Sequence, residues 1–319
     1  MRYVPFGPEL DGMPQVLVGG EARPRAMLTL SQRASSPTPP ALLADTTAEM
    51  ALKLLRSREF RPIVDTVEAV TSERCDADSL LAVWALLNPD EALLRAEHVG
   101  EAARAGTFHV RRSSEAAQFA CWINGFRRDE GLAEEADAFR AMLPLVAAAL
   151  DRPRDFDLCW IGEYSDLIHD SAMLDSGAVQ IEEYPELDLA IMETPLWLHD
   201  MVRFSALSGF RVLTVRSENT YTLEYRLESW VQYQSRRPLP RIDLRPLAAR
   251  LNLFERFPGS WRADPVDQPR PRLFFDAGEG RPAPSALAAE TVIAEVLDFF
   301  RQNAARRDLQ WSPYGPVRA

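Results

Sequence analysis

The fold is most constrained by the stretch from Glu68 to Leu87. A β-branched apolar segment that ends at Ser72 leads into a polar cluster, and a helical pattern of apolar residues follows at once. This order of strand, polar turn and helix is typical of α/β folds, whose ligand sites lie at the carboxyl ends of the strands. We therefore expect Asp76 and Asp78 to lie at such a junction.

Two chemical interpretations of these aspartates stay open. In the first, Asp76 and Asp78 bind a hard divalent cation, Mg²⁺ or Mn²⁺, through carboxylate oxygens, and Glu73, Cys75 or Asp45 completes the ligand shell. In the second, Asp78 caps the helix that follows and Asp76 is solvated. Asp45 or Thr46 is expected to cap the helix that follows, and Glu49 adds the capping-box pattern typical of a helix N-terminus.

The first part of the chain predicts a helix-rich α/β lobe over residues 1–177. Short apolar runs indicate strands at 2–6, 15–18, 26–30 and 63–72. Helical periodicity covers 45–56, 78–87, 91–105, 114–126, 132–150 and 161–174, with a break expected at 106–109.

The composition shifts toward strand-forming residues after Gly177, which predicts a β-rich α+β lobe over residues 178–319. Strands are expected at 179–183, 187–193 and 272–275, and a hairpin at 210–216 with 220–233. Short helices are expected at 198–207 and 243–253, and a final helix is expected at 285–305. The predicted fold class is therefore α/β with two lobes.

Composition narrows the classes of partner. The net charge of −11 argues against a broad surface for nucleic acid, and no apolar run is long enough to span a bilayer. The three cysteines are widely spaced, which argues against a disulfide framework or a structural zinc site. The first residues lack the apolar core of a signal peptide, so we expect a cytoplasmic protein. The sequence leaves the oligomeric state open.

Two further groups could contribute chemistry. His199, followed by Asp200, is a candidate metal ligand or general base, or alternatively the polar start of a helix. Arg236, Arg237 and Arg241 lie on a proline-rich segment and could clamp a phosphate or a carboxylate, although this could instead be a solvated loop in which Arg241 pairs with Asp243. The sequence contains no Gly-rich phosphate loop and no nucleophile elbow.

The segment Thr71–Ala82, with Asp76-Ala-Asp78 at its centre, resembles the first motif of the DHH phosphoesterase superfamily. The second lobe is similar in order to the substrate-binding domain of that superfamily, notably at 188–191, 210–216, 221–226 and 242–249. The resemblance implies cleavage of phosphodiester or phosphoanhydride bonds with two Mn²⁺ or Mg²⁺ ions. The chain departs from the pattern because Ser72 replaces the motif's histidine and no Asp-His-His is present.

Over most of its length the sequence also resembles a family of uncharacterised bacterial proteins. Recognisable segments, in order, are 36–40, 76–78, 199–200 and 230–243. This resemblance implies no activity.

The sequence therefore supports two alternative functions. The first is a divergent metal-dependent phosphoesterase that acts on or binds a small phosphorylated molecule between the lobes. In it, Asp76, Asp78, Asp45 and His199 bind metal, and arginines of the 236–241 segment bind phosphate. The alternative is a non-catalytic ligand-binding or regulatory protein on a degenerate phosphoesterase scaffold.

Overall fold

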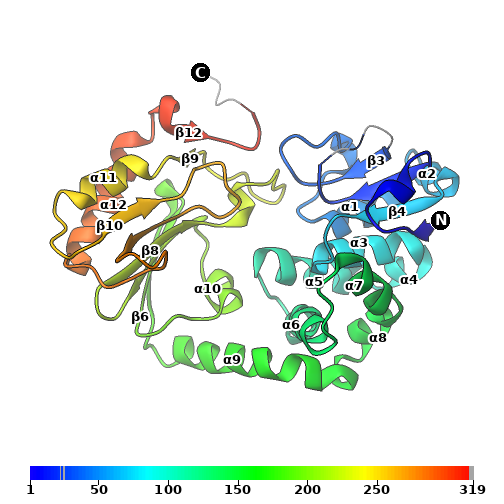
Figure 1. The fold of residues 1–319 in the computed structure, drawn as a ribbon, viewed down its shortest axis with the longest axis horizontal. Helices are drawn as coiled ribbons and strands as arrows, with labels where there is room; N and C mark the ends of the chain where they lie inside the picture. The colour runs from blue at the N-terminus through cyan, green and yellow to red at the C-terminus, as the bar shows by residue number, and fades with distance from the viewer. Residues whose placement is uncertain (22, 24–25, 316–319) are drawn as a thin grey trace. The chain divides into compact units, whose positions relative to one another are not determined.

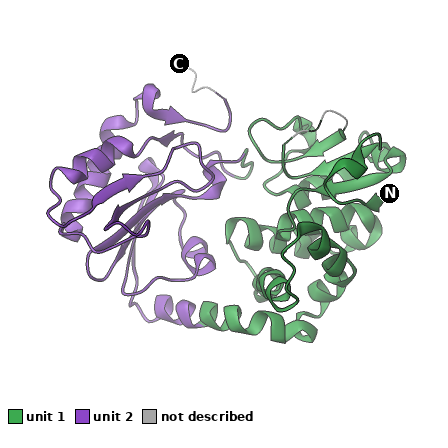
Figure 2. Cartoon of the chain, viewed as in Figure 1, with its two compact units in different colours: residues 1–168, 232–235 green, residues 169–231, 236–319 purple. Residues whose placement is uncertain are grey.

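The computed structural model describes residues 1–21, 23 and 26–315 and divides the chain into two compact units (Figures 1 and 2). Unit 1 comprises residues 1–168 and 232–235, and unit 2 comprises residues 169–231 and 236–319. The first division falls inside the long helix α9 (Asp157–Asp175), and the predicted boundary at Gly177 follows the end of that helix. The sequence did not indicate that residues 232–235 return to unit 1.

Unit 1 contains a four-stranded parallel sheet in the order β1-β4-β2-β3. Its strands are β1 (Arg2–Tyr3), β2 (Gln15–Val18), β3 (Ala26–Leu30) and β4 (Ala69–Ser72). All residues of β2 and β4 are buried, as expected for parallel strands covered on both faces. The predicted strand at 63–72 is wrong in its first half, which forms α2 (Arg61–Thr66), because Pro62 suits the first turn of a helix.

Helices make up the rest of unit 1, and their bounds differ from the prediction where proline or close packing intervenes. The predicted helix at 132–150 is interrupted by a 3₁₀ turn that contains Pro144. The helix break expected at 106–109 comes later in the chain, because the helix includes Gly106 and ends at Phe108. A Cβ atom at Gly106 would lie 2.3 Å from the Cβ of Ala77, so glycine lets its helix approach closely the helix that begins at Ala77. The helices are α1 (Thr47–Arg56), α3 (Ala77–Leu87), α4 (Pro89–Leu94), α5 (Ala96–Phe108), α6 (Ser114–Asp129), α7 (Glu135–Met142), α8 (Val146–Asp151) and the first part of α9.

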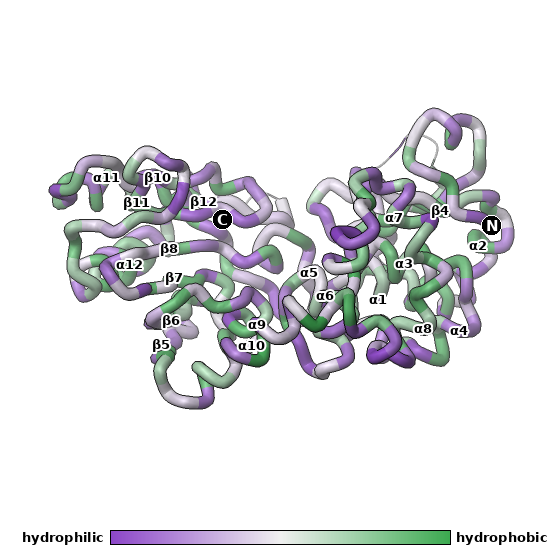
Figure 3. The backbone as a smooth tube through the Cα atoms, turned by 60° about the horizontal axis from the view of Figure 1, so that its bottom comes forward, coloured by the Kyte–Doolittle hydropathy of each residue, from purple (hydrophilic) through white to green (hydrophobic). Residues whose placement is uncertain are grey.

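Helices α1 and α3 pack on each other and on the sheet, which brings their N-termini into the region of the predicted site. Helix α1 begins with the predicted capping box, in which Thr46 and Glu49 exchange hydrogen bonds. Helix α3 is buried along ten of its residues, and Figure 3 shows it as a hydrophobic segment. Burial of these two helices therefore fixes the polar residues at their starts.

Unit 2 contains a six-stranded sheet in the order β10-β11-β8-β7-β6-β5. Its strands are β5 (Gln180–Tyr184), β6 (Leu189–Thr194), β7 (Arg211–Arg216), β8 (Thr220–Tyr225), β10 (Ser260–Ala263) and β11 (Arg272–Asp276). Strands β6 and β7 are parallel and joined by α10 (Asp200–Ala206), whereas the other described pairs are antiparallel. The predicted hairpin is confirmed, but its second strand ends at Tyr225 because the chain then enters a 3₁₀ turn at Leu227–Ser229.

One face of this sheet carries the hydrophobic core of unit 2. Alternate residues such as Leu213, Val215 and Leu223 pack with α11 (Arg245–Asn252) and α12 (Ala289–Asn303). A small sheet pairs β9 (Arg241–Ile242) with β12 (Gln310–Trp311). The two units together confirm the predicted α/β class. Among residues 1–21, 23 and 26–315, no helix combines the length and hydropathy needed to cross a bilayer.

Candidate functional site

Asp76 lies where β4 ends and α3 begins, as the sequence predicted. Asp76 is exposed as a residue, and its carboxylate caps α3, since Oδ1 accepts a hydrogen bond from the backbone N–H of Ser79 at 2.8 Å. Desolvation of this carboxylate at the start of the helix raises its pKa. Gly19 follows β2 at the same sheet edge with a φ of +67°. A Cβ atom there would lie 3.4 Å from the Oγ of Ser79, so the edge is closely packed around the start of α3.

Asp78 is not the cap of its own helix, so that interpretation is corrected. Its side chain is buried, and its two oxygens accept hydrogen bonds from Thr47 N at 2.8 Å and Ala48 N at 2.7 Å. Asp78 on α3 therefore caps the N-terminus of α1. Burial, with a smaller effect from neighbouring Asp76, raises the pKa of Asp78 to about 7, although the two N–H donors oppose the shift.

Asp45 is buried just before α1 and anchors the segment of residues 232–235. Its Oδ1 accepts hydrogen bonds from the backbone N–H groups of Gln234 at 2.7 Å and Ser235 at 2.8 Å. Its Oδ2 accepts a hydrogen bond from the Ser235 hydroxyl and lies 3.2 Å from the Arg104 guanidinium. Four donors on one carboxylate make Asp45 a structural anchor as well as a wall of the pocket described below.

Unit 1 thus brings Asp45, Asp76 and Asp78 to the starts of α1 and α3, but their oxygens bind different protein donors. A metal ion at Asp45 or Asp78 would have to displace backbone N–H groups, so the carboxylates in this arrangement do not fit the predicted metal centre. In the described part of the chain, no three His, Cys, Asp or Glu side chains form a group suited to a metal. Binding of Mg²⁺ or Mn²⁺ stays a prediction.

His199 belongs to unit 2, where it caps α10. Its Nδ1 accepts a hydrogen bond from the backbone N–H of Met201 at 3.1 Å. The backbone N–H of His199 donates to Asp170 Oδ2 at 2.6 Å. In this geometry His199 is the polar residue that starts a helix, which is the second of its two interpretations.

The three predicted phosphate-binding arginines also lie in unit 2, and each already has protein contacts. Arg241 has no exposed surface, and its guanidinium donates to Ser229 Oγ and to four backbone carbonyls. We therefore leave Arg241 out of the proposed site. Its suggested partner Asp243 pairs instead with Arg245.

Arg236 and Arg237 are more exposed than Arg241 but are also held in place. Arg236 pairs with Asp188 at 3.0 Å and lies over the ring of Phe210 at 3.8 Å. Arg237 lies over the ring of Tyr314 at 4.6 Å. These contacts are typical of arginines that fix a loop against its own unit.

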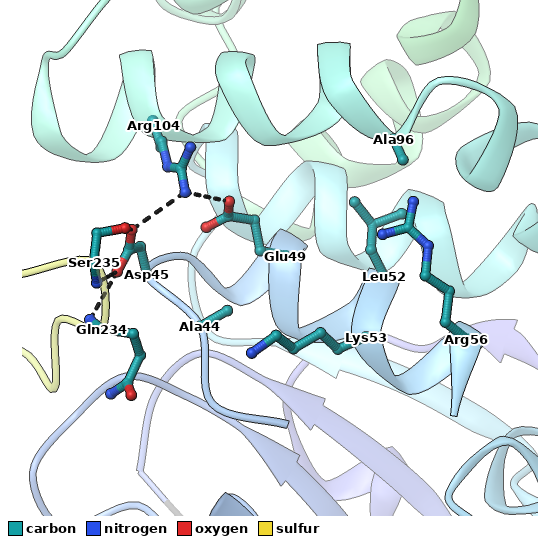
Figure 4. A pocket seen from close by; sticks show the side chains of 10 residues that line it. All are labelled: Ala44, Asp45, Glu49, Leu52, Lys53, Arg56, Ala96, Arg104, Gln234 and Ser235. Atoms are coloured by element: carbon teal, nitrogen blue, oxygen red, sulfur yellow. Dashed lines mark hydrogen bonds and ion pairs between the residues drawn. The ribbon is translucent and has the colours of Figure 1, made fainter. Parts of the chain in front are cut away.

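A pocket of about 280 Å³ in unit 1 is lined by charged residues, among which Lys53, Arg56 and Arg104 were not predicted as site residues (Figure 4). Glu49, Lys53 and Arg56 come from α1, and Arg104 comes from α5. The residues that line it are Ala44, Asp45, Glu49, Leu52, Lys53, Arg56, Ala96, Arg104, Gln234 and Ser235. Spacing of three and four residues along α1 could have indicated one charged helix face, but Arg104 and Ser235 join it only through the fold.

Arg104 organises one wall of this pocket. Its guanidinium bridges two carboxylates, at 2.6 Å from Glu49 and 3.2 Å from Asp45. Burial raises the pKa of Glu49, while the positive charge of Arg104 opposes the shift. The bridge therefore fixes Arg104 in one orientation beside the pocket (Figure 4).

Fold and site together define a two-unit α/β protein with a charged pocket beside the first helix of its parallel-sheet unit. The family model described as "Family of unknown function (DUF6687)" matches residues 1–311, and the chain belongs to this family. This confirms the predicted membership of a family without an assigned function. Comparisons with curated proteins and with solved structures find no match. The likeness to DHH phosphoesterases stays a prediction.

Proposed function

We propose that the chain binds a small phosphorylated molecule in the pocket of unit 1 without turning it over. The observation that carries the proposal is the excess of positive charge, since Lys53, Arg56 and Arg104 face only two lining carboxylates. Ammonium and guanidinium groups are the usual side-chain donors to phosphate. The volume, about 280 Å³, suits a small molecule.

Two of these cations are available to a ligand. Lys53 and Arg56 are exposed, and in the described part of the chain neither lies within ion-pair distance of a carboxylate. Lys53 donates a hydrogen bond to the Leu43 carbonyl, which places its ammonium group near the pocket wall. A phosphate that accepts from both side chains would gain two charge-assisted hydrogen bonds.

Binding is favoured over hydrolysis by the state of the acidic residues. Asp45 accepts from four donors and Asp78 from two, so these carboxylates hold the scaffold together. A general base or a metal ligand needs an oxygen free to take a proton or a cation.

Replacing Lys53 and Arg56 with glutamine should weaken phosphate binding at least tenfold, because each charge-assisted hydrogen bond contributes about 1.5–3 kcal/mol. Isothermal titration of inorganic phosphate and a panel of sugar phosphates at low ionic strength measures the change. Arg58→Gln is the matched control, since Arg58 is exposed just after α1 and does not line the pocket. Equal affinity of the double variant and the parent protein, or no binding by any phosphorylated probe, would contradict the proposal.

A metal-dependent phosphoesterase is the second candidate, and the exposure of Asp76 at the carboxyl edge of the sheet favours it. It predicts calorimetric binding of Mn²⁺ that Asp76→Asn weakens at least tenfold, together with Mn²⁺-dependent release of phosphate from a substrate panel. Asp90→Asn, an exposed acid on α4, serves as the control. If Mn²⁺ binds equally to the parent and the Asp76 variant, this candidate is excluded.

A further inference from the structure

The parallel pair β6 and β7 in unit 2 places two loops at one sheet edge. Helix α10 connects the two strands, so both carboxyl ends point the same way, which is where ligands bind in such βαβ units. The register pairs Thr194 with Arg216 at this edge. The loop after Thr194 carries Trp197, and the Arg216 guanidinium lies 5.6 Å from the centroid of the indole ring.

Trp197 combines exposure with a fixed position. Trp197 is 44% exposed, although tryptophan is a large apolar residue that is on average highly buried. The guanidinium of Arg203 lies 4.1 Å from the ring centroid, and Arg203 itself has no exposed surface. Hydrogen bonds to Thr214 at 3.1 Å and Glu224 at 2.7 Å hold Arg203 in place. An indole supported in this way presents a rigid apolar surface to a ligand.

Arg216 is partly buried without a counter-charge. No carboxylate lies within ion-pair distance of it among residues 1–21, 23 and 26–315, and its burial lowers its pKa. Arg270, another arginine of unit 2, differs, since it pairs with Asp200 at 2.9 Å and Glu224 at 3.4 Å. A partly desolvated cation without a counter-charge is unfavourable, and an anionic ligand would relieve that cost.

We propose that Trp197 and Arg216 form a binding site for a small molecule that joins an aromatic ring to an anionic group, as a nucleoside monophosphate does. The ring stacks on the exposed side of the indole, and the anionic group pairs with Arg216. The site lies within unit 2 and is independent of the function proposed for the pocket of unit 1.

The test compares adenosine 5′-monophosphate, adenosine and ribose 5-phosphate by isothermal titration. The full chain should bind the nucleotide at least tenfold more tightly than either fragment, because only the nucleotide makes both contacts. Trp197→Ala and Arg216→Gln should each weaken nucleotide binding about tenfold or more, which corresponds to about 1.4 kcal/mol. Trp197→Phe keeps an aromatic ring and should retain most of the affinity, which separates loss of stacking from loss of folding.

Two control variants keep this site distinct from the pocket of unit 1. Leu196→Ala changes a neighbouring side chain that is 57% exposed and should leave nucleotide affinity unchanged. The Lys53 and Arg56 double variant should also leave it unchanged. The proposal is overturned if Trp197→Ala binds the nucleotide like the parent protein, if ribose 5-phosphate binds equally well, or if only the double variant loses binding.

Discussion

Replacing Arg203 with alanine should lower the free energy of unfolding by about 3–5 kcal/mol, because the buried carboxylate of Glu224 loses its partner at 2.7 Å and keeps only Arg270 at 3.4 Å. Arg203 has no exposed surface and pairs with Glu224 at 2.7 Å and Asp200 at 2.6 Å. Glu224 is also buried, so water cannot replace the lost guanidinium. Equilibrium unfolding in urea measures the change.

A double variant separates the effect of losing the ion pair from the effect of losing packing. Arg203→Met with Glu224→Leu removes both charges while it keeps most of the volume, and buried pairs replaced in this way are often no less stable. We expect the double variant to recover most of the stability that Arg203→Ala loses. Arg281→Ala is the control, since its side chain is 75% exposed. A change in stability from Arg203→Ala no larger than that from the control would show that the buried network contributes nothing.

Replacing Asp78 with asparagine should remove a pH dependence of stability that the parent protein shows between about pH 4 and pH 7. The pKa of Asp78 is raised in the fold from its ordinary value of 3.8 to about 7. The folded state therefore holds this proton where the unfolded state has lost it, so stability falls as the pH rises through that window. A shift of about three pKa units corresponds to about 4 kcal/mol.

The asparagine variant has a constant cost of its own. Asp78 accepts from Thr47 N and Ala48 N with separate oxygens, and asparagine offers only one, so about 1–3 kcal/mol is lost at every pH. The parent should therefore be more stable than the variant near pH 4, by about 1–3 kcal/mol, and less stable than the variant near pH 8, where it has lost about 4 kcal/mol. Urea unfolding across this range checks it, with Asp90→Asn as the control. A pH-independent difference would refute the raised pKa.

Local sequence patterns predicted much of unit 1 correctly. The bounds of β2 and β3 match the predicted strands because short apolar runs between turn residues have few other solutions. Thr46 and Glu49 of the capping box are only three positions apart, so the capping box could be identified without the fold. The place of Asp76 between strand and helix follows from the same kind of local order.

The partners of the buried charges could not be predicted in this way. Asp78 caps a helix that begins 31 residues earlier, and Asp45 binds backbone groups about 190 residues away. Arg104 comes from α5 and completes the pocket only because α5 packs beside α1 and α3. Within this pocket, local sequence patterns point to Asp45 but not to Lys53, Arg56 or Arg104.

The sequence by itself therefore determined where helices and strands begin, because capping and periodicity act over a few neighbouring residues. The tertiary structure alone decided what each acidic side chain does. A carboxylate with the same local pattern can bind a metal, a helix N-terminus or a guanidinium, and the choice depends on which donors packing brings to it. Asp76 and Asp78 are two residues apart, yet one caps its own helix and the other caps a neighbouring helix in the core.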